Sequence, residues 1–422
     1  MVLQYILIKS AFEVRLLKID ALRRPFAPGT YDRRYVPVAD GFRVLCVLFV
    51  GWFHIWQQSW LNPMLEIGGL RLDLSGPVRA GYMLVDMMIL LSGFLLFLPY
   101  ARSREDGEPL PDLRAYYTRR ALRILPSYYL CVLITFFLYG LRGYSSVRSM
   151  LLDLIGHLTF THNQFYESYI GTRLPGVLWT LAVEVQFYLI APMIGRAFIR
   201  RPFVTYACMT AAAFFYRFVY VAGLSDSSLY FNRLPAMLDV YANGMLAAWA
   251  FVRLGKRKRL RTSALAGCLG TLVCILAIWG VYRITSVQYR IPNGYQAIRW
   301  GQMIYRFPLT ALGALFLIGG SFASAWFQFL FSNRAVRFLA GISYNFYIWH
   351  AHVALRLRAW HIPPYESEMP QSAGEQPWQQ LYTYLCFIAA LAVAAAVTYL
   401  WERPMNRTLS RLCEKRRRFS SK

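Results

Sequence analysis

An arginine and a histidine stand eleven residues apart in one apolar stretch, which reads ADGFRVLCVLFVGWFHIWQQSW from Ala39 to Trp60. Eleven residues of α-helix rise ~16 Å through three turns plus ~20°, so Arg43 and His54 share one helix face. Lipid gives neither side chain a partner, and ionisable groups inside a membrane usually mark a pathway or a site. Imidazole titrates near neutral pH and can act as a general base. The structural alternative is a snorkelling arginine beside a hydrogen-bonded, packed histidine.

Two further arginines open another apolar run, which reads RRALRILPSYYL from Arg119. Arg120 and Arg123 are three residues apart and therefore share a helix face, whereas Arg119 points elsewhere. Two guanidinium groups on one face form a fork that suits a phosphate. Anchoring of the helix end in the cytoplasm is the simpler alternative. Pro126 is expected to bend the helix just inside the membrane and to open space there.

Two carboxylates lie in other apolar runs. Asp86 begins the run VDMMILLSGFLLFLP, and Glu184 lies in LWTLAVEVQFYLIAPMI, five residues beyond Trp179, which fits the outer interface. A carboxylate at the depth of Glu184 needs a partner. That partner is either an arginine such as Arg233, in a structural ion pair, or a group of a functional site, which we favour. For Asp86 two roles stay open, capping of a helix end and orientation of an imidazole.

A late apolar run, GISYNFYIWHAHVAL, carries a tyrosine near its cytoplasmic start and two histidines further along. Tyr344 lies near that start, and His350 lies one to two turns deeper, on a different side from His352. Metal ligation by this histidine pair is not expected at that spacing without a carboxylate cluster. A packed, hydrogen-bonded His350 is the alternative to a site residue. The chain has no phosphate-binding loop, nucleophile elbow, HExxH or dinucleotide-binding motif in a fitting context.

The composition places these residues in a membrane protein. The 422-residue chain is 57% hydrophobic and 16% charged, whereas a soluble domain carries about 25% charged residues. Its net charge is +25, and the basic residues lie in short connectors between apolar runs. This pattern indicates membrane topology rather than nucleic-acid binding. The seven cysteines are scattered without a CxxC motif, so neither a zinc site nor a disulfide framework is predicted.

The apolar runs predict the architecture, because a membrane span needs roughly 20 apolar residues. Met150 to Phe160 is too short to cross, and connectors rich in Lys and Arg follow every even-numbered run, which puts both chain ends in the cytoplasm. We therefore expect an all-α polytopic membrane protein of about ten transmembrane helices plus one short re-entrant or interfacial helix, N-in/C-in. The ten predicted spans are 40–60, 82–101, 121–140, 177–198, 203–223, 234–254, 262–282, 305–325, 338–358 and 380–400.

Three regions are predicted along the chain. Residues 1–38 form a cytoplasmic amphipathic segment, 39–404 the membrane domain and 405–422 a basic cytoplasmic tail. The first twenty residues are too charged and too short to span and contain no small-residue cleavage site, so they are expected to lie along the membrane face. The tail is expected to contact the same face through its basic residues.

Together these segments resemble the integral-membrane acyltransferase family 3, a group of bacterial O-acyltransferases, across almost the whole chain. ADGFRVLCVLFVGWFH resembles the family's first helix, in which ten residues separate an Arg from a His. VDMMILLSGFLL, RRALRILP and WTLAVEVQFYL resemble the next three motifs, with Thr180 where the family usually has Ser. RLPAMLDVYANGMLAA, GISYNFYIWHAHV and the closing ERP are similar to three more, the first with a longer spacing. The order and number of these motifs carry the resemblance.

The resemblance implies an enzyme that transfers an acyl group, by default acetyl, from cytoplasmic acyl-CoA to a hydroxyl. Arg43, Arg120 and Arg123 are then expected to bind the phosphates of CoA. The expected catalytic residues are His54 as general base, with Glu184 or Asp86 orienting it; an acyl-His intermediate is the alternative to direct transfer. The expected substrate-binding residues are Trp56, Trp179, Arg233, Tyr344 and His350. No metal is expected.

The resemblance also implies the partners. The acceptor is expected to be a cell-envelope glycan, a lipid-linked sugar or a small hydroxylated metabolite, and the location a bacterial cytoplasmic (inner) membrane. The lipid bilayer is a partner and nucleic acid is not; the oligomeric state is not indicated. The alternatives are a secondary transporter, a glycan flippase or polymerase, or a non-catalytic scaffold, although the paired interrupted helices typical of many transporters are not evident.

Overall fold

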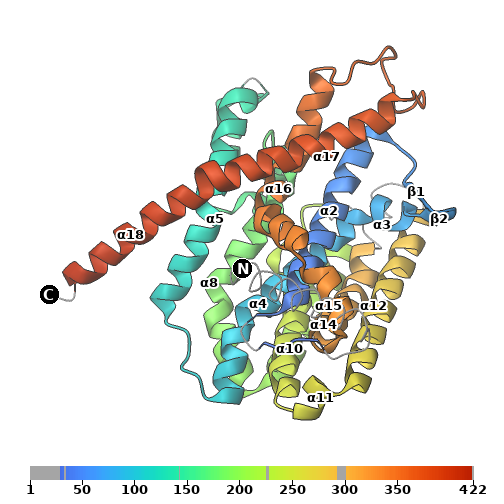
Figure 1. Ribbon diagram of the computed structural model, residues 1–422. Helices are drawn as coiled ribbons and strands as arrows, with labels where there is room; N and C mark the ends of the chain where they lie inside the picture. The colour runs from blue at the N-terminus through green and yellow to red at the C-terminus, as the bar shows by residue number, and fades with distance from the viewer. Residues whose placement is uncertain (1–28, 33–34, 142, 225–227, 292–300, 421–422) are drawn as a thin grey trace, which may run out of the picture.

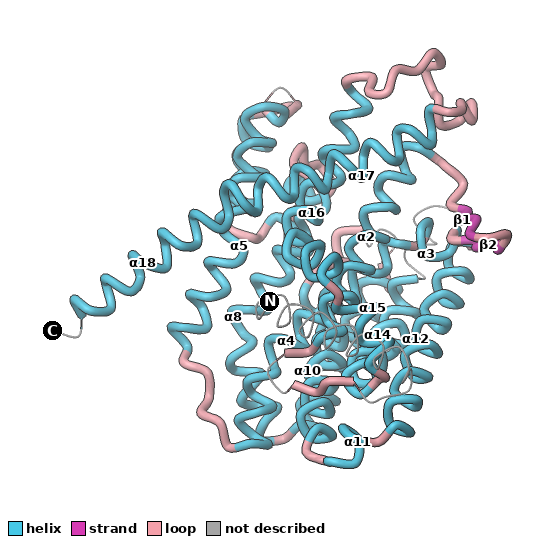
Figure 2. Tube along the Cα trace, viewed as in Figure 1, coloured by secondary structure: helices cyan, strands magenta, loops and turns pink. Residues whose placement is uncertain are grey.

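The computed structural model describes residues 29–32, 35–141, 143–224, 228–291 and 301–420, and nearly all of these segments are helical (Figure 2). The long helices are α2 (Pro37–Ser59), α4 (Leu84–Asp106), α5 (Leu113–Thr135), α8 (Trp179–Arg200), α9 (Pro202–Tyr216), α10 (Leu238–Gly255), α12 (Ala264–Arg290), α14 (Arg306–Phe322), α16 (Arg334–Ala359), α17 (Trp378–Ala396) and α18 (Arg403–Ser420). The shorter helices are α3 (Ser75–Arg79), α6 (Val147–Leu158), α7 (Tyr166–Tyr169), α11 (Lys258–Thr262) and α15 (Ala325–Ser332).

Short π-helical and 3₁₀ turns extend several of these helices. The π-helical turns are Phe136–Gly140, Arg217–Ala222, Gly301–Tyr305 and Val397–Glu402, and the 3₁₀ turns are Gly81–Met83, His162–Gln164, Gly176–Leu178 and Leu234–Met237. The described strands are β1 (Met64–Ile67) and β2 (Leu70–Asp73), an antiparallel hairpin that pairs Met64 with Asp73. This hairpin was not predicted from the sequence.

The all-α polytopic fold predicted from the sequence is confirmed. Eight helical segments of the described chain are long and apolar enough to cross a membrane: Pro37–Ser59, Gly81–Asp106, Leu113–Gly140, Gly176–Arg200, Pro202–Ala222, Ala264–Arg290, Met303–Phe322 and Trp378–Cys413. Each coincides with one of the ten predicted spans. The other two predicted spans are also helical, as α10 and α16. The count of about ten crossings and the N-in/C-in orientation stay predictions.

The two less apolar helices are enclosed by other helices. α10 packs against α4, α9 and α14, and Asp239 and Asn243 are buried in it together with most of its apolar residues. α16 packs against α2 and α17 and buries Asn345 and His350. A helix surrounded by protein does not need an apolar surface toward lipid, so polar side chains are tolerated when they find partners.

The stretch that carries Arg43 and His54 is the central helix, α2. Pro37 begins it, because a proline at the first helical position loses no hydrogen bond that the helix would otherwise make. α2 contacts α4, α14, α15, α16 and α17, and Figure 1 shows it inside the bundle. Arg43 and His54 are therefore carried on a helix that several other helices surround.

The structure describes the two predicted end regions of the chain to different extents. The predicted segment 1–38 lies mostly outside the described residues. At the other end, α17, the turn Val397–Glu402 and α18 follow one another as one long helix that projects beyond the bundle (Figure 1). The predicted short helix is confirmed as α6, with 12 residues; its placement relative to the membrane stays a prediction.

Candidate active site

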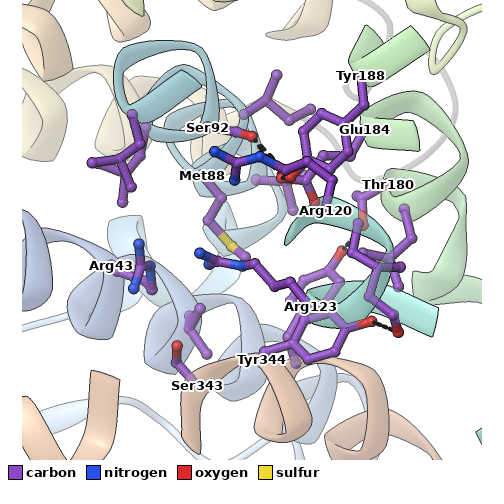
Figure 3. Close-up of a pocket in the computed structure, with 18 residues that line it drawn as sticks. Arg43, Met88, Ser92, Arg120, Arg123, Thr180, Glu184, Tyr188, Ser343 and Tyr344 are labelled. Atoms are coloured by element: carbon purple, nitrogen blue, oxygen red, sulfur yellow. Dashed lines mark hydrogen bonds between the residues drawn. The ribbon is translucent and has the colours of Figure 1, made fainter. Parts of the chain in front are cut away.

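A cavity of about 80 Å³ opens between α2, α4, α5, α8 and α16. A site for one water needs about 10–15 Å³ of such space, so this cavity holds several waters or part of a thin ligand. Its polar lining comes from α2, α4, α5, α8 and α16 and comprises Arg43, Ser92, Arg120, Arg123, Thr180, Glu184, Tyr188, Ser343, Tyr344 and Tyr347. Figure 3 shows the guanidinium groups of Arg43, Arg120 and Arg123 pointing toward the same space.

The three arginines reach the cavity from two helices. Asp112 caps α5 by accepting a hydrogen bond from the N–H of Ala115 at 2.8 Å, and the i, i+3 spacing then turns Arg120 and Arg123 to one side. Arg43 approaches from α2 and lies within electrostatic range of Arg123. Among the described residues, no carboxylate forms a salt bridge with any of the three. The cavity therefore offers guanidinium groups to an anion.

The guanidinium of Arg120 also rests on aromatic rings. Its Cζ lies 5.4 Å from the ring centroid of Tyr188 and 5.9 Å from that of Tyr116. The hydroxyl of Tyr116 donates to the carbonyl oxygen of Tyr188 at 3.2 Å, which joins α5 to α8. Stacking of this kind orients the planar guanidinium while leaving its N–H groups available in the plane.

Glu184 faces the arginines across the cavity. Ser92 Oγ and Tyr188 OH each donate to its Oε1 at 2.6 Å, so one carboxylate oxygen is held firmly. Arg233, the structural partner considered from the sequence, instead donates to the carbonyl of Gln164 at 2.7 Å and lies over the ring of Tyr230. The structural alternative of an ion pair between Glu184 and Arg233 is therefore wrong, because Arg233 contacts Gln164 and Tyr230 instead.

His54 does not line this cavity. Its Nδ1 lies 3.0 Å from Oε1 of Gln57, one turn along α2, and its ring centroid lies 5.2 Å from that of His350. His350 Nδ1 lies 2.7 Å from the carbonyl of Tyr347. Because carbonyls only accept, His350 carries its proton on Nδ1, and its buried Nε2 has no hydrogen-bond partner in the described part of the chain. If Gln57 is likewise an acceptor, the basic nitrogen of His54 is Nε2.

Tyr347 both lines the cavity and neighbours His350. It lines the cavity, and its ring centroid is 5.9 Å from that of His350, one turn further along α16. Its hydroxyl donates to the carbonyl of Val177 at 3.1 Å and accepts from Thr180 Oγ1 at 2.9 Å. The side chain is therefore held at both its ring and its hydroxyl, at the end of the cavity nearest to His350.

Asp86 is part of a buried ion pair away from the imidazole. Arg306 Nε lies 2.9 Å from Asp86 Oδ2, and Arg306 also donates to the carbonyls of Phe231 and Ala236. A second buried pair joins Arg217 to Asp239. Among the described residues, no hydrogen bond joins Asp86 or Glu184 to His54, and the orientation of its ring by one of them stays a prediction. Both carboxylates have other partners in the structure, and Gln57 lies beside the ring.

The remaining predicted residues are divided between the cavity and its surroundings. Tyr344 lines the cavity, and its hydroxyl donates to the carbonyl of Ile124 at 3.0 Å. Trp56 lies under the guanidinium of Arg79 at 4.9 Å, and half-buried Trp179 begins α8. The cavity thus gathers five of the predicted site residues, Arg43, Arg120, Arg123, Glu184 and Tyr344. It does not gather His54, Asp86, Trp56, Trp179, Arg233 and His350.

Sequence reasoning missed several residues of the site. Tyr188 lies four residues after Glu184, a spacing that places both on one helix face and could have identified it. Ser92 lies on a different helix from Glu184, and its hydrogen bond to that carboxylate is not indicated by the spacing within either run. The pairing of Tyr347 with Thr180 joins residues 167 positions apart, which no local pattern indicates. In the described ranges, no group of three His, Cys, Asp or Glu side chains is arranged to hold a metal ion.

Comparison with known proteins finds a matching family. Residues 37–401 match the model of a family described as an acyltransferase domain. The peptidoglycan O-acetyltransferase OatA of Listeria monocytogenes is 25% identical over 338 residues, 76% of this chain and 49% of that protein. The putative peptidoglycan O-acetyltransferase YrhL of Bacillus subtilis is 24% identical over the same shares. A putative O-acetyltransferase of Staphylococcus aureus is 21% identical, over 87% of this chain and 56% of that protein. The chain thus spans about half the length of these relatives. No solved structure matches.

Proposed function

Because the chain belongs to the acyltransferase family matched over residues 37–401, we propose that it is a membrane O-acyltransferase. It moves an acyl group, by default acetyl, from a cytoplasmic acyl-CoA to a hydroxyl of an acceptor. The observation that carries this proposal is the cavity lined by Arg43, Arg120 and Arg123, which have no carboxylate in salt-bridge contact among the residues that the structure describes. A cluster of this kind suits a polyanionic ligand, and the phosphates of CoA have that chemistry.

The donor is held by the arginines and by Glu184. The guanidinium groups bind phosphate oxygens of CoA through charge-assisted hydrogen bonds. Glu184 Oε1 is occupied by Ser92 and Tyr188, and Oε2 accepts from an amide N–H of the pantetheine arm. Glu184 therefore acts on the donor in this proposal. Asp86 has no part in the chemistry, because Arg306 holds it.

His54 is the general base. Its Nδ1–H donates to Gln57, and Nε2 takes the proton of the acceptor hydroxyl as the oxygen attacks the thioester carbonyl. The C–O bond forms, the C–S bond breaks, and the proton on Nε2 leaves with the thiolate as CoA thiol. The neutral amide of Gln57 fixes the tautomer without adding a negative charge, unlike the carboxylate of a serine-hydrolase triad.

The donor must pass Tyr347 to reach His54. Tyr347 and Thr180 line the cavity, whereas His54 does not line it and lies beside His350. In this proposal the structure is a closed state, in which the donor cavity and the base are separated. Movement of one tyrosine side chain is enough to connect them in this proposal, and a lid of this kind keeps water from the thioester until the acceptor is present.

The acceptor is proposed from the relatives. Two of them are named peptidoglycan O-acetyltransferases, one of these as putative, so a cell-envelope glycan hydroxyl is the first acceptor to test. A lipid-linked sugar and a small hydroxylated metabolite follow. This acceptor approaches His54 from the side opposite the arginine cavity, with Trp56 and His350 nearby. The proposed location is the cytoplasmic membrane of a bacterium.

The test is acetyl-CoA binding and thioester consumption by the purified chain in lipid nanodiscs. Wild type, His54→Ala and the double variant Arg120→Ala/Arg123→Ala are compared. We expect saturable binding that falls at least tenfold in the double variant, and consumption that is lost in His54→Ala while binding is kept. Absence of binding of any acyl-CoA by folded wild type would overturn the donor assignment. The exposed Arg71, which pairs with Glu66, provides the control variant Arg71→Ala.

A further inference from the structure

The last π-helical turn of the long C-terminal helix carries a carboxylate that joins two walls of the cavity. Glu402 Oε2 accepts a hydrogen bond from Asn345 Nδ2 on α16 at 2.6 Å and from Ser127 Oγ on α5 at 3.2 Å. Asn345 and Ser127 are fully buried. Asn345 also donates to Thr398 at 2.8 Å. One carboxylate oxygen therefore bridges α5 and α16, and we call Ser127, Asn345 and Glu402 the clamp.

Two further hydrogen bonds reach the same turn of α5. Trp401 Nε1 donates to the carbonyl of Pro126 at 2.9 Å, and the hydroxyl of Tyr344 donates to the carbonyl of Ile124 at 3.0 Å. Residues 124, 126 and 127 of α5 thus all form hydrogen bonds with α16 or with the turn Val397–Glu402. This turn follows Arg123 directly, so its position determines where the guanidinium groups of α5 project.

α5 depends on such contacts more than the central helices do. Only 39% of the apolar stretch in the segment Leu113–Gly140 is buried inside the bundle, against 78% of the apolar stretch in Gly81–Asp106, which contains α4. Pro126 within the helix removes one backbone N–H and so weakens the helix at this point. A helix with little buried apolar surface and an internal proline is free to shift unless polar contacts fix it. Hydrogen bonds to a charged acceptor are the stronger kind.

We propose that Glu402 is a positioning residue for the donor site. The clamp fixes α5 against α16, so that Arg120 and Arg123 face Arg43 across the cavity. Arg123 also lies within electrostatic range of Glu402, so the carboxylate acts on one of the two arginines as well as on the turn that follows it. The inference rests on the proposed function, because it assigns the clamp to the acyl-CoA arginines. Glu402 does not itself line the cavity.

The first test is equilibrium binding of CoA to the full chain in nanodiscs, together with acetyl-transfer kinetics. Glu402→Ala leaves the Ser127 hydroxyl and one Asn345 N–H without an acceptor, and we expect the dissociation constant for CoA to rise about tenfold. Glu402→Gln keeps an accepting oxygen and is expected to stay within about threefold of wild type. The rate at saturating acetyl-CoA stays within twofold in both, because His54 is untouched. Glu368→Ala, at an exposed loop position, is the matched control.

A purely structural role gives a different result. Destabilisation lowers the fraction of protein that binds CoA, while the dissociation constant of the remaining fraction is unchanged. That outcome, or equal dissociation constants for Glu402→Ala and wild type, would overturn the proposal. A dissociation constant for Glu402→Gln that is close to the wild-type value supports the proposal.

A second measurement separates this inference from the proposed function. Amide hydrogen exchange of the segment 113–135 is followed by mass spectrometry without any ligand. We expect faster exchange in Glu402→Ala than in wild type or Glu402→Gln, with exchange of α12 (264–290) unchanged. If wild type binds no CoA but this difference is seen, the clamp stands and the donor assignment fails. If CoA binds and exchange of α5 is unchanged in Glu402→Ala, the clamp is wrong and the donor assignment stands.

Discussion

The ring centroids of His54 and His350 lie 5.2 Å apart, on α2 and α16. Each ring has its Nδ1 beside an oxygen, of Gln57 for His54 and of backbone carbonyls for His350. Gly51 allows this approach: a Cβ added there would lie 2.7 Å from Cε1 of Phe346 and 3.8 Å from Cδ2 of His350. The ring edge of His350 that includes Cδ2 and Nε2 therefore faces α2, one turn before His54.

The histidine pair predicts unequal effects of substitution. His54→Gln is expected to lower the rate of acyl transfer by about 10²–10⁴-fold, because the general base is lost. His350→Gln is expected to raise the KM for the acceptor by up to tenfold with a smaller loss of rate, because Nε2 accepts a hydrogen bond from the acceptor. Steady-state kinetics in nanodiscs measure both. His361→Gln, in the loop after α16, is the control, and wild-type turnover in folded His54→Gln would contradict the assignment.

The hydrogen bonds of Tyr347 lead to a prediction about the hydrolysis of acetyl-CoA in the absence of acceptor. Tyr347→Phe keeps the ring but removes the hydrogen bonds to Val177 and from Thr180, which lowers the cost of moving the side chain by about 1 kcal/mol or more. We expect hydrolysis of acetyl-CoA in the absence of acceptor to rise roughly fivefold or more. Release of free CoA thiol measures this rate. Tyr384→Phe, at an exposed position of α17, should leave it unchanged, and an unaltered rate in Tyr347→Phe would exclude the closed-state interpretation.

The buried pair Asp86–Arg306 predicts a loss of stability rather than of chemistry. Asp86→Asn breaks the buried ion pair with Arg306, and breaking such a pair by changing one partner costs about 3–5 kcal/mol. We expect the thermal denaturation midpoint in detergent to fall by roughly 5 °C or more, while the rate per folded molecule stays close to wild type. The exposed pair Arg71–Glu66 gives the control Glu66→Gln, with little change. A normal midpoint together with lost transfer would restore Asp86 as a catalytic candidate.

Helical spacing in the sequence predicted part of the lining of the cavity. Arg120 and Arg123 share a face because they are three residues apart, and both line the cavity with Arg43 and Glu184. Each of these four residues interrupts an apolar run, and a bundle turns such residues toward its interior. The family resemblance supplied their roles, and the structure supplied the fact that they face one space.

The partners of the buried charges could not be predicted in this way. Arg306 pairs with Asp86 across 220 residues, and Glu402 reaches Ser127 across 275. Such pairings depend on which helices become neighbours, which periodicity within one helix does not encode. The same limit applies to His54: its partner Gln57 is local, but its neighbour His350 lies on α16, which packs against α2.

Asp153 on α6 predicts how the loop between α5 and α8 responds to acid. Its carboxylate accepts hydrogen bonds from Tyr144 at 2.6 Å, from Thr172 at 2.9 Å and from the N–H of Arg173 at 3.0 Å. His157 Nδ1 lies 3.0 Å from it. Burial alone would raise the pKa of Asp153, but the hydrogen bonds and the charge of His157 outweigh burial and lower it below its ordinary value of 3.8.

A carboxylate whose folded-state pKa is depressed stabilises the fold above its unfolded pKa, and this contribution disappears as pH falls through the folded pKa. We expect protection of the segment 144–173 against proteolysis to be constant above about pH 5 and to decline below about pH 4. Asp153→Asn should show weaker protection at pH 7 and a flatter dependence on pH. Asp73, in the exposed hairpin, provides the control Asp73→Asn. Equal protection of wild type and Asp153→Asn at pH 7 would show that these hydrogen bonds do not hold the loop.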